Sequence, residues 1–495
     1  MLALIGFDAA SPAILEELLS EDRLPHLRAL RASGTQLSLE TPAANFPAGV
    51  YPTVWSGVPL GQHGIHFPFM WSAQEQRVRY HVSFPYPVAM WERLSQHGVR
   101  CVVLDAYESL VPQTIEGLYL RGWQFRNRVV LQRAGAPAGA RRRWEARLGR
   151  APRGEEVFGR PDERRLRRLA STLLAAPRRI ADLAVAAAQE LRPDLLVVSM
   201  PAVHIGGHQL WDPSWVLQGA RLGTGAELRS TLRRIYVEAD TALGRIIDSL
   251  PADADVVVYS ALGMGTETSR QDVLGSLLGA VLDGRGGDGR PGAAWDFRGS
   301  IPASLRARVA DRLPDRAAVS LTAALELRGV DWAATRAFAL PSDSVGYIRL
   351  NLRDRERDGV VAAGDADALV EEIRAGLQEF TLPSGAPAIT SAERTADIMP
   401  REAAASLFPD LLVRWSAEPA RADEVLTSRS FGTVQRKGVG SGRSGNHTAD
   451  AWALVVPGAA RLKTPRARPD IIDLAATALG RFGLDHNGQE LLERP

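Results

Sequence analysis

Five short apolar runs, spread along a chain of 495 residues, constrain the fold more than any other feature. Turn residues bound each run, and stretches with helical patterning separate them. Strands that are buried on both faces of a parallel sheet have this continuous apolar character, and helices usually connect them. The sequence therefore predicts an α/β fold, with a mostly parallel central sheet covered by helices on both faces. The runs are residues 2–7, 101–104, 195–199, 256–260 and 453–456.

Three segments between these runs have the periodicity of amphipathic helices. We expect short helices over residues 12–19 and 25–32, and a longer one over residues 164–190. Pro177 lies inside the long segment and has no N–H to donate. We therefore expect the long helix to be broken or kinked there.

Composition shifts divide the chain into a core and an insertion. We expect residues 1–272 and 421–495 to form the core, and residues 273–420 to form a smaller α+β subdomain or cap. The insertion contains the glycine-rich segment 283–290 and a predicted strand at 347–352. An arginine-rich stretch at 121–168 also contains acidic residues, so we predict solvated helix faces there rather than an anion-binding patch.

The charge balance and the single cysteine exclude several classes of protein. A net charge of +2 provides no field that would attract a nucleic-acid polymer or an anionic membrane. Cys101 cannot form an internal disulfide, and its apolar neighbours predict a buried thiol. No apolar run approaches the roughly 20 residues of a membrane span, and the first residues lack the basic start of a signal peptide. We therefore expect a cytoplasmic protein without a nucleic-acid or membrane partner, and the charge does not indicate which other partners it has.

The clearest candidate for chemistry follows the run at 195–199. His204 and His208 are four residues apart, so on a helix their rings would converge and could chelate a metal. Two intervening glycines allow a tight turn instead, with both histidines as ordinary polar loop residues. His447 lies in a glycine-rich loop before the last core strand. Three neutral imidazoles are typical of a zinc site with one open position, although iron or manganese would also fit.

Asp8 and Thr53 are further candidates, each with an alternative structural role. Asp8 follows the first strand, where it could bind a metal, act as a catalytic acid, or cap the next helix. Thr53 could be a nucleophile, or could simply lie in a short helix that Ser56 and the following glycine close. His63 and His66 are weaker candidates from the same region.

Several motifs, in order along the chain, resemble the type I phosphodiesterase/nucleotide pyrophosphatase family of the alkaline phosphatase superfamily. They are Leu4-Ile-Gly-Phe-Asp8, Leu24-Pro-His-Leu, Ser56-Gly57 with His63-Gly64-Ile65, Val256-Val-Val-Tyr-Ser, Gly445-Asn-His447 and Asp470-Ile-Ile-Asp. This resemblance implies an alkaline-phosphatase-like fold with a cap. It also implies two metals that activate a Thr, Ser or modified Cys for attack on phosphorus or sulfur.

The chain departs from the family pattern at three places. The first metal site of the family uses an Asp and a His four residues apart with a late His, and here these positions are His204, His208 and His447. The Asp-His pair of the second site is replaced by Ala261-Leu262, which argues against a second metal and leaves Asp8 without co-ligands. Asn45 stands where the attacking hydroxyl should be, with Thr53 the nearest substitute.

Together with the family resemblance, these features predict a hydrolase of small-molecule phosphate esters with one metal, most simply zinc, held by three histidines. Either Thr53 or a metal-bound water could be the nucleophile. The alternatives are a catalytically silent homologue that binds an anionic ligand or a partner, and a single-metal group-transfer enzyme, lyase or sulfatase.

Overall fold

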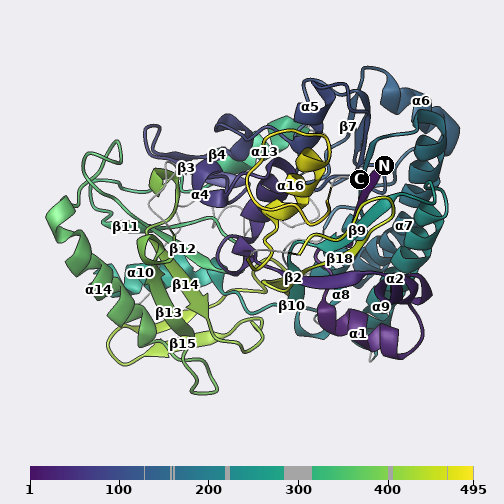
Figure 1. Cartoon of the computed structure of the whole chain (residues 1–495). Coiled ribbons are helices and arrows are strands. Elements are labelled where there is room, and N and C mark those ends of the chain that lie inside the picture. The colour runs from purple at the N-terminus through teal and green to yellow at the C-terminus, as the bar shows by residue number, and fades with distance from the viewer. Residues whose placement is uncertain are drawn as a thin grey trace.

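The structure is a computed structural model that describes residues 1–127, 129–156, 159, 162–217, 223–283, 315–399, 405–464 and 467–493. Most of the glycine-rich segment predicted at 283–290 lies outside these residues. Figure 1 shows the central sheet with its helices on one side of the molecule and a group of antiparallel strands on the other.

An eight-stranded mixed sheet forms the centre of the fold, and all five predicted runs are strands in it. Neighbouring pairs among β9, β1, β8, β5 and β6 are parallel, whereas β2, β18 and β7 run antiparallel to their neighbours. The predicted α/β sheet is therefore confirmed. In sheet order the strands are β2 (Thr35–Leu39), β18 (Ala451–Val456), β9 (Asp255–Ser260), β1 (Leu2–Gly6), β8 (Leu195–Ser199), β5 (Cys101–Leu104), β6 (Gly117–Arg121) and β7 (Ala134–Ala136).

The register of the three central strands brings their carboxyl ends together. Gly6 at the end of β1 pairs with Ser199 of β8 on one side and with Tyr259 of β9 on the other. Segments that follow these strands therefore meet at one edge of the sheet, where ligands of α/β proteins bind. Asp8 and α8 (Pro201–Leu210) are both placed there.

The predicted helices are present as α1 (Pro12–Ser20), α2 (Pro25–Ser33) and α7 (Glu163–Leu191). The predicted break at Pro177 is wrong, because a single helix continues through this buried proline, while the alternative of a kink stays a prediction. One face of α7 is buried from Leu166 to Ala188 and packs against α9 (Thr224–Ile247). Burial of that whole face offsets the hydrogen bond lost at one proline.

A second, antiparallel sheet lies within the region predicted as an insertion. Its strands are β11 (Ala337–Leu340), β12 (Gly346–Leu350), β14 (Leu411–Trp415) and β13 (Ile389–Arg394), in that order. Helices α10 (Gln271–Asp283) and α14 (Ala366–Gln378) pack against each other and against this sheet. The predicted strand at 347–352 is β12, while the domain boundaries themselves stay predictions.

The arginine-rich stretch is partly a solvated helix and partly sheet. Arg143 and Arg147 of α6 (Ala140–Leu148) form exposed ion pairs with Glu190, as expected for a solvated face. Strand β7, however, extends the central sheet from within this stretch. Cys101 is fully buried, as predicted.

No helix in the described part of the chain is long and apolar enough to span a membrane.

The remaining elements surround these two sheets. The elements are α3 (Val50–Ser56), α4 (Leu60–His63), β3 (Phe69–Ser72), β4 (Arg77–Tyr80), α5 (Met90–Ser95), β10 (Gly263–Thr266), α13 (Asp315–Leu325), α15 (Thr395–Ile398), β15 (Val425–Ser428), β16 (Gly432–Gln435), β17 (Gly445–Thr448) and α16 (Ile472–Arg481).

Candidate metal centre

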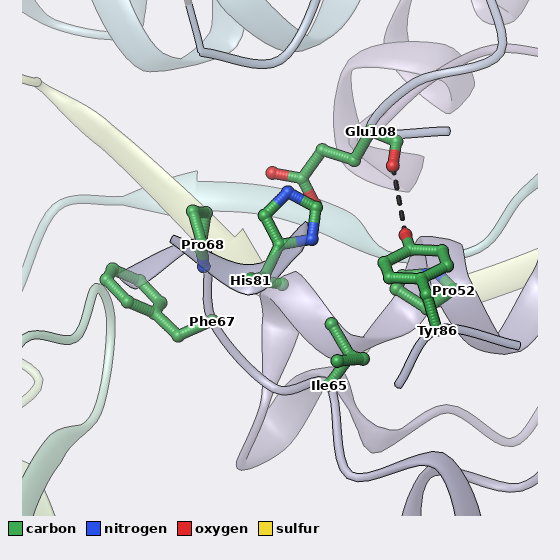
Figure 2. A pocket seen from close by; sticks show the side chains of 8 residues that line it. Pro52, Ile65, Phe67, Pro68, His81, Tyr86 and Glu108 are labelled. Carbon is green, nitrogen blue, oxygen red and sulfur yellow. Dashed lines mark hydrogen bonds between the residues drawn. The ribbon is translucent and has the colours of Figure 1, made fainter. Parts of the chain in front are cut away.

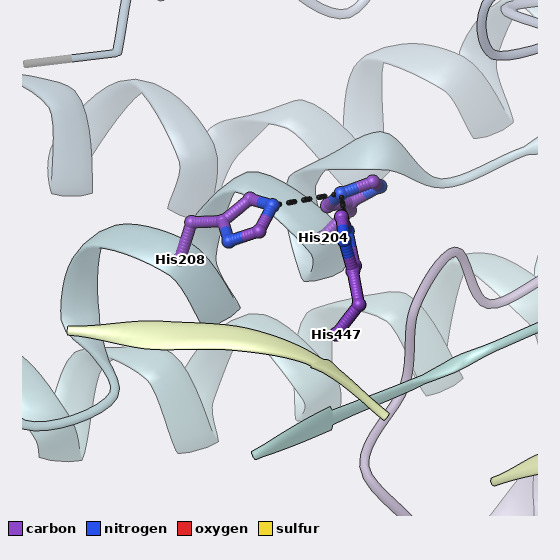
Figure 3. Close-up of side chains that lie close together, drawn as sticks. All are labelled: His204, His208 and His447. Atoms are coloured by element: carbon purple, nitrogen blue, oxygen red, sulfur yellow. Dashed lines mark hydrogen bonds between the residues drawn. The ribbon is translucent and has the colours of Figure 1, made fainter. Parts of the chain in front are cut away.

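Three histidines converge at the carboxyl edge of the central sheet (Figure 3). His204 and His208 lie one turn apart on α8, which forms the predicted helix rather than a turn. His447 lies on the short strand β17, where a loop was expected, and β17 pairs with β10. The Nε2 atom of His204 is 3.0 Å from that of His208 and 2.8 Å from that of His447.

Glycines allow α8 and the β10–β17 ribbon to approach this closely. A Cβ on Gly207 would lie 2.7 Å from Cγ of Met264 in β10, and a Cβ on Gly445 would lie 2.3 Å from the carbonyl oxygen of Gly207. Real Cβ atoms do not approach other atoms so closely. Gly207, one of the two glycines that weaken the helix propensity of α8, is therefore required where the helix meets the ribbon.

The outer nitrogen of each ring lies near an acceptor, and for His208 a hydrogen bond to that acceptor fixes the tautomer. His208 Nδ1 donates to the carbonyl oxygen of Gly445 at 2.8 Å, because a carbonyl can only accept. His204 Nδ1 lies 3.2 Å from Oδ2 of Asp8, and His447 Nδ1 lies 3.4 Å from Oδ2 of Asp343. With protons on all three Nδ1 atoms, three Nε2 lone pairs would be directed at one another.

Burial keeps the three rings neutral. It lowers the pKa of His204 to about 3, and it lowers the pKa values of His208 and His447 below their ordinary range. Three neutral acceptors at this separation repel one another unless a cation lies between them. Tetrahedral zinc with Zn–N bonds near 2.05 Å would hold its nitrogens about 3.3 Å apart, so an expansion of a few tenths of an ångström would admit the ion. The three histidines therefore fit a divalent metal.

Asp8 lies behind His204, on the side away from the other two histidines. It is only 4% exposed, and neither of its carboxylate oxygens has a hydrogen bond of good geometry, although Oδ2 is near His204 Nδ1. Burial raises its pKa well above the ordinary value. A carboxylate behind a ligating histidine orients the ring and increases its basicity. The structure thus gives Asp8 a position for holding His204.

Asp343 supports His447 in the same way, and no sequence pattern pointed to it. It lies in the loop between β11 and β12 of the second sheet. Its carboxylate accepts hydrogen bonds from Arg443 at 3.0 Å and from Asn446 at 3.3 Å. Burial by itself would raise the pKa of Asp343. Arg443 and His447 together outweigh this effect, so the pKa lies well below the ordinary value.

A buried network extends outward from Asp343. Arg443 also pairs with Glu156 at 3.0 Å, and Asn446 donates to both carboxylate oxygens of Glu267 at 3.1 Å. Burial and Asp343 raise the pKa of Glu267 to about 7. Residues from three separate parts of the chain therefore determine the position of the strand that bears His447.

Thr53 is not among the residues that converge. It lies on α3, where its hydroxyl donates to the carbonyl oxygen of Gly49 at 2.8 Å. His63 Nδ1 accepts the Ile65 N–H at 3.0 Å, so His63 Nε2 carries the proton and donates to Thr53 Oγ1 at 2.9 Å. Tyr51, two residues earlier on α3, is the one that contacts the His204 ring. Residues two apart on a helix point in nearly opposite directions, so Thr53 faces away from His204.

The other candidates from this region make local contacts. Ser56 Oγ donates to the carbonyl oxygen of Pro52 at 2.6 Å, and Gly57 ends α3 with a φ of 68°. His66 Nδ1 contacts the Gly64 carbonyl oxygen at 3.0 Å, and its ring packs among aromatic residues, with burial lowering its pKa to about 4. Asn45 Oδ1 accepts a hydrogen bond from Arg414.

The positions expected for a second metal carry no ligands. Ala261 and Leu262 follow β9 at the same sheet edge, and both are buried. The residues that the structure describes contain one group of three or more potential ligands, namely His204, His208 and His447.

Comparison with known proteins identifies the family. The model of the family described as type I phosphodiesterase / nucleotide pyrophosphatase matches residues 2–417. The chain belongs to this family. Membership confirms the resemblance seen in the sequence and the predicted enzyme class, a phosphodiesterase-like hydrolase of the alkaline phosphatase superfamily. Among curated proteins, none matches the chain in sequence.

Solved structures confirm the alkaline-phosphatase-like fold. Phosphonoacetate hydrolase from Sinorhizobium meliloti 1021, in complex with phosphonoformate, matches with a TM-score of 0.53 at 14% identity, covering 96% of this chain and 94% of that one. Its complex with phosphonoacetate gives a TM-score of 0.51 at the same identity and coverage. Murine ectonucleotide pyrophosphatase / phosphodiesterase 5 in complex with AMP has a TM-score of 0.49 at 10% identity, with 99% of each chain covered.

Proposed function

We propose that this protein is a metal-dependent hydrolase of small phosphate esters, and that it uses one divalent metal held by His204, His208 and His447. The observation that supports this most directly is the convergence of the three Nε2 atoms, with an acceptor near Nδ1 of each ring. When bound, such a metal would polarise a phosphoryl oxygen. Zinc suits three neutral imidazoles best.

The residues around the metal ligands would have distinct roles. Asp8 and Asp343 would orient His204 and His447 and keep their Nδ1 atoms protonated. Arg443 would hold Asp343 in place, since its guanidinium bonds to that carboxylate and to Glu156. The replacement of ligands at Ala261 and Leu262 supports a single metal.

Thr53 and a water molecule are the two proposed nucleophiles. The Thr53 hydroxyl already donates one hydrogen bond to Gly49 and accepts one from His63, which favours the water. A rival proposal is a silent homologue that binds an anionic ligand, and it is supported by Asn45 at the expected nucleophile position.

Elemental analysis and ester assays together test this function. We expect about one zinc per chain in the wild type, loss of zinc in the His204→Ala/His208→Ala double variant, and full zinc in His97→Ala, whose ring is exposed. The zinc-loaded protein should hydrolyse bis(p-nitrophenyl) phosphate but not p-nitrophenyl sulfate, and a chelator should abolish turnover. A protein that binds zinc but hydrolyses no phosphate ester would support the silent homologue.

A further inference from the structure

Residues of α3 and of the loop after β5 help to line a small cavity (Figure 2). Pro52 and Glu108 line it, and the residue before each of them contacts His204. Tyr51 lies 6.4 Å from the His204 ring and Tyr107 stacks on that ring at 4.5 Å, both measured between ring centroids. Tyr51 and Tyr107 thus connect the cavity lining to His204, and Glu108 is close enough to Asp8 and Asp343 to interact electrostatically with both.

Glu108 gives the cavity its chemical character. Among the described residues that line it, only Glu108 has a side chain that can be negatively charged, and the others are apolar or aromatic apart from His81. Burial lowers the pKa of His81 to about 3, so that ring is neutral. The remaining lining residues are Ala48, Pro52, Ile65, Phe67, Pro68 and Tyr86.

The carboxylate of Glu108 has no hydrogen bond or ion pair with any described residue, although its backbone is firmly held. Its carbonyl oxygen accepts a hydrogen bond from the Tyr86 hydroxyl at 3.1 Å. Its φ of 51° is in the left-handed region, which is strained for a residue with a Cβ. Nearby cations are engaged elsewhere, since Arg443 bonds to Asp343 and Arg121 to the carbonyl oxygens of Ser109 and Gln132.

We propose that this cavity binds a primary ammonium group on the alcohol part of the substrate, paired with the Glu108 carboxylate. The inference rests on the proposed function, because it names the class of phosphate ester that the metal centre would cleave. The aromatic rings of Phe67 and Tyr86 would add cation–π attraction.

The space inside the cavity favours small cations. The centre of a water-sized sphere can occupy a volume of about 10 Å³ inside the cavity. Room for one water molecule requires roughly 10–15 Å³ on that measure. An –NH₃⁺ group is close to water in size, whereas a trimethylammonium group is several times larger. We therefore expect selection of primary over quaternary ammonium groups.

Calorimetric titration of the zinc-loaded protein with ethylammonium tests the cavity without requiring turnover. We expect saturable binding in the millimolar range that suits so small a ligand. Binding should be about tenfold or more weaker in Glu108→Gln and for tetramethylammonium. Glu116→Gln removes an exposed charge from the same loop and should bind ethylammonium like the wild type. Equal binding by Glu108→Gln, or no binding by the wild type, overturns the proposal.

A pair of diesters links the cavity to catalysis. Methyl 2-aminoethyl phosphate and methyl propyl phosphate differ only in an ammonium for a methyl group. The wild type should prefer the first by about tenfold in kcat/KM, and Glu108→Gln should lose this preference. If neither diester is hydrolysed while ethylammonium binding still depends on Glu108, the proposed hydrolase fails and the ammonium site stands. Equal hydrolysis of both diesters by the wild type overturns the ammonium site.

Discussion

Oδ2 of Asp343 lies 3.4 Å from Nδ1 of His447, although the two residues belong to different sheets. Asp343 comes from the loop between β11 and β12, and His447 from the β10–β17 ribbon beside the central sheet. The second sheet thus supplies a carboxylate that orients a proposed metal ligand. Metal affinity should therefore depend on the packing of the second sheet.

Asp343→Asn keeps the shape of this side chain but removes its charge. We expect zinc affinity to fall by about 10–100-fold, because carboxylates behind ligating histidines contribute on that scale. Competition with a chromophoric chelator would measure the affinity. Asp354→Asn is a matched control on the loop after β12, where Asp354 is exposed. Unchanged zinc affinity in Asp343→Asn would mean that Asp343 supports only the fold, and thermal unfolding would then show the whole effect.

Sequence patterns were sufficient for five of the eight strands of the central sheet and for naming all three histidines. The apolar runs predicted five strands, and the spacing of His204 and His208 predicted their convergence on α8. Asp343 could not be predicted, because its role depends on how a loop of the second sheet packs against β17. No periodicity within either segment contains that information.

Thr53 shows a second reason why the sequence alone was insufficient. Its sequence context allows both a nucleophile and a helix residue, and only the hydrogen bonds to Gly49 and His63 separate the two. The error at Pro177 has a similar cause, since the local preference for a break is outweighed by the burial of α7 against α9.

Gly445→Ala tests whether close packing of the ribbon on α8 forms the metal centre. The new Cβ would lie 2.3 Å from the Gly207 carbonyl oxygen, so β17 must move and the contact of His208 with residue 445 must weaken. We expect zinc affinity to fall at least tenfold, with a lower melting temperature. Gly275→Ala is the control, since it faces open space on helix α10 and should slightly stabilise the protein. Wild-type zinc affinity in Gly445→Ala would contradict this account of the packing.

Thr53→Val separates a structural from a catalytic role for this hydroxyl. The change leaves a buried His63 N–H without its acceptor, so we expect a loss of about 1–3 kcal/mol in the free energy of unfolding. Thr241→Val removes a similar hydrogen bond, to the Val237 carbonyl oxygen on an exposed helix face, and should change stability by less than about 0.5 kcal/mol. With zinc bound and the protein folded, we expect kcat of Thr53→Val to stay within about threefold of wild type. A fall of about a thousandfold would instead identify Thr53 as the nucleophile.

Ammonium binding should depend on pH through Glu108. Burial and the nearby carboxylates, Asp8 first among them, raise the pKa of Glu108 to about 8, so its carboxyl group is neutral below that pH and anionic above it. An alkylammonium ion stays charged up to about pH 10, as lysine does. Ethylammonium affinity in metal-free protein should therefore increase as the pH rises from 7 to 9. A bound divalent cation favours the anionic carboxylate, so zinc should shift this increase to lower pH. Calorimetric titrations with and without zinc would measure both curves, and Glu108→Gln should show neither increase. An affinity that is independent of pH in the wild type would show that Glu108 does not pair with the ammonium group.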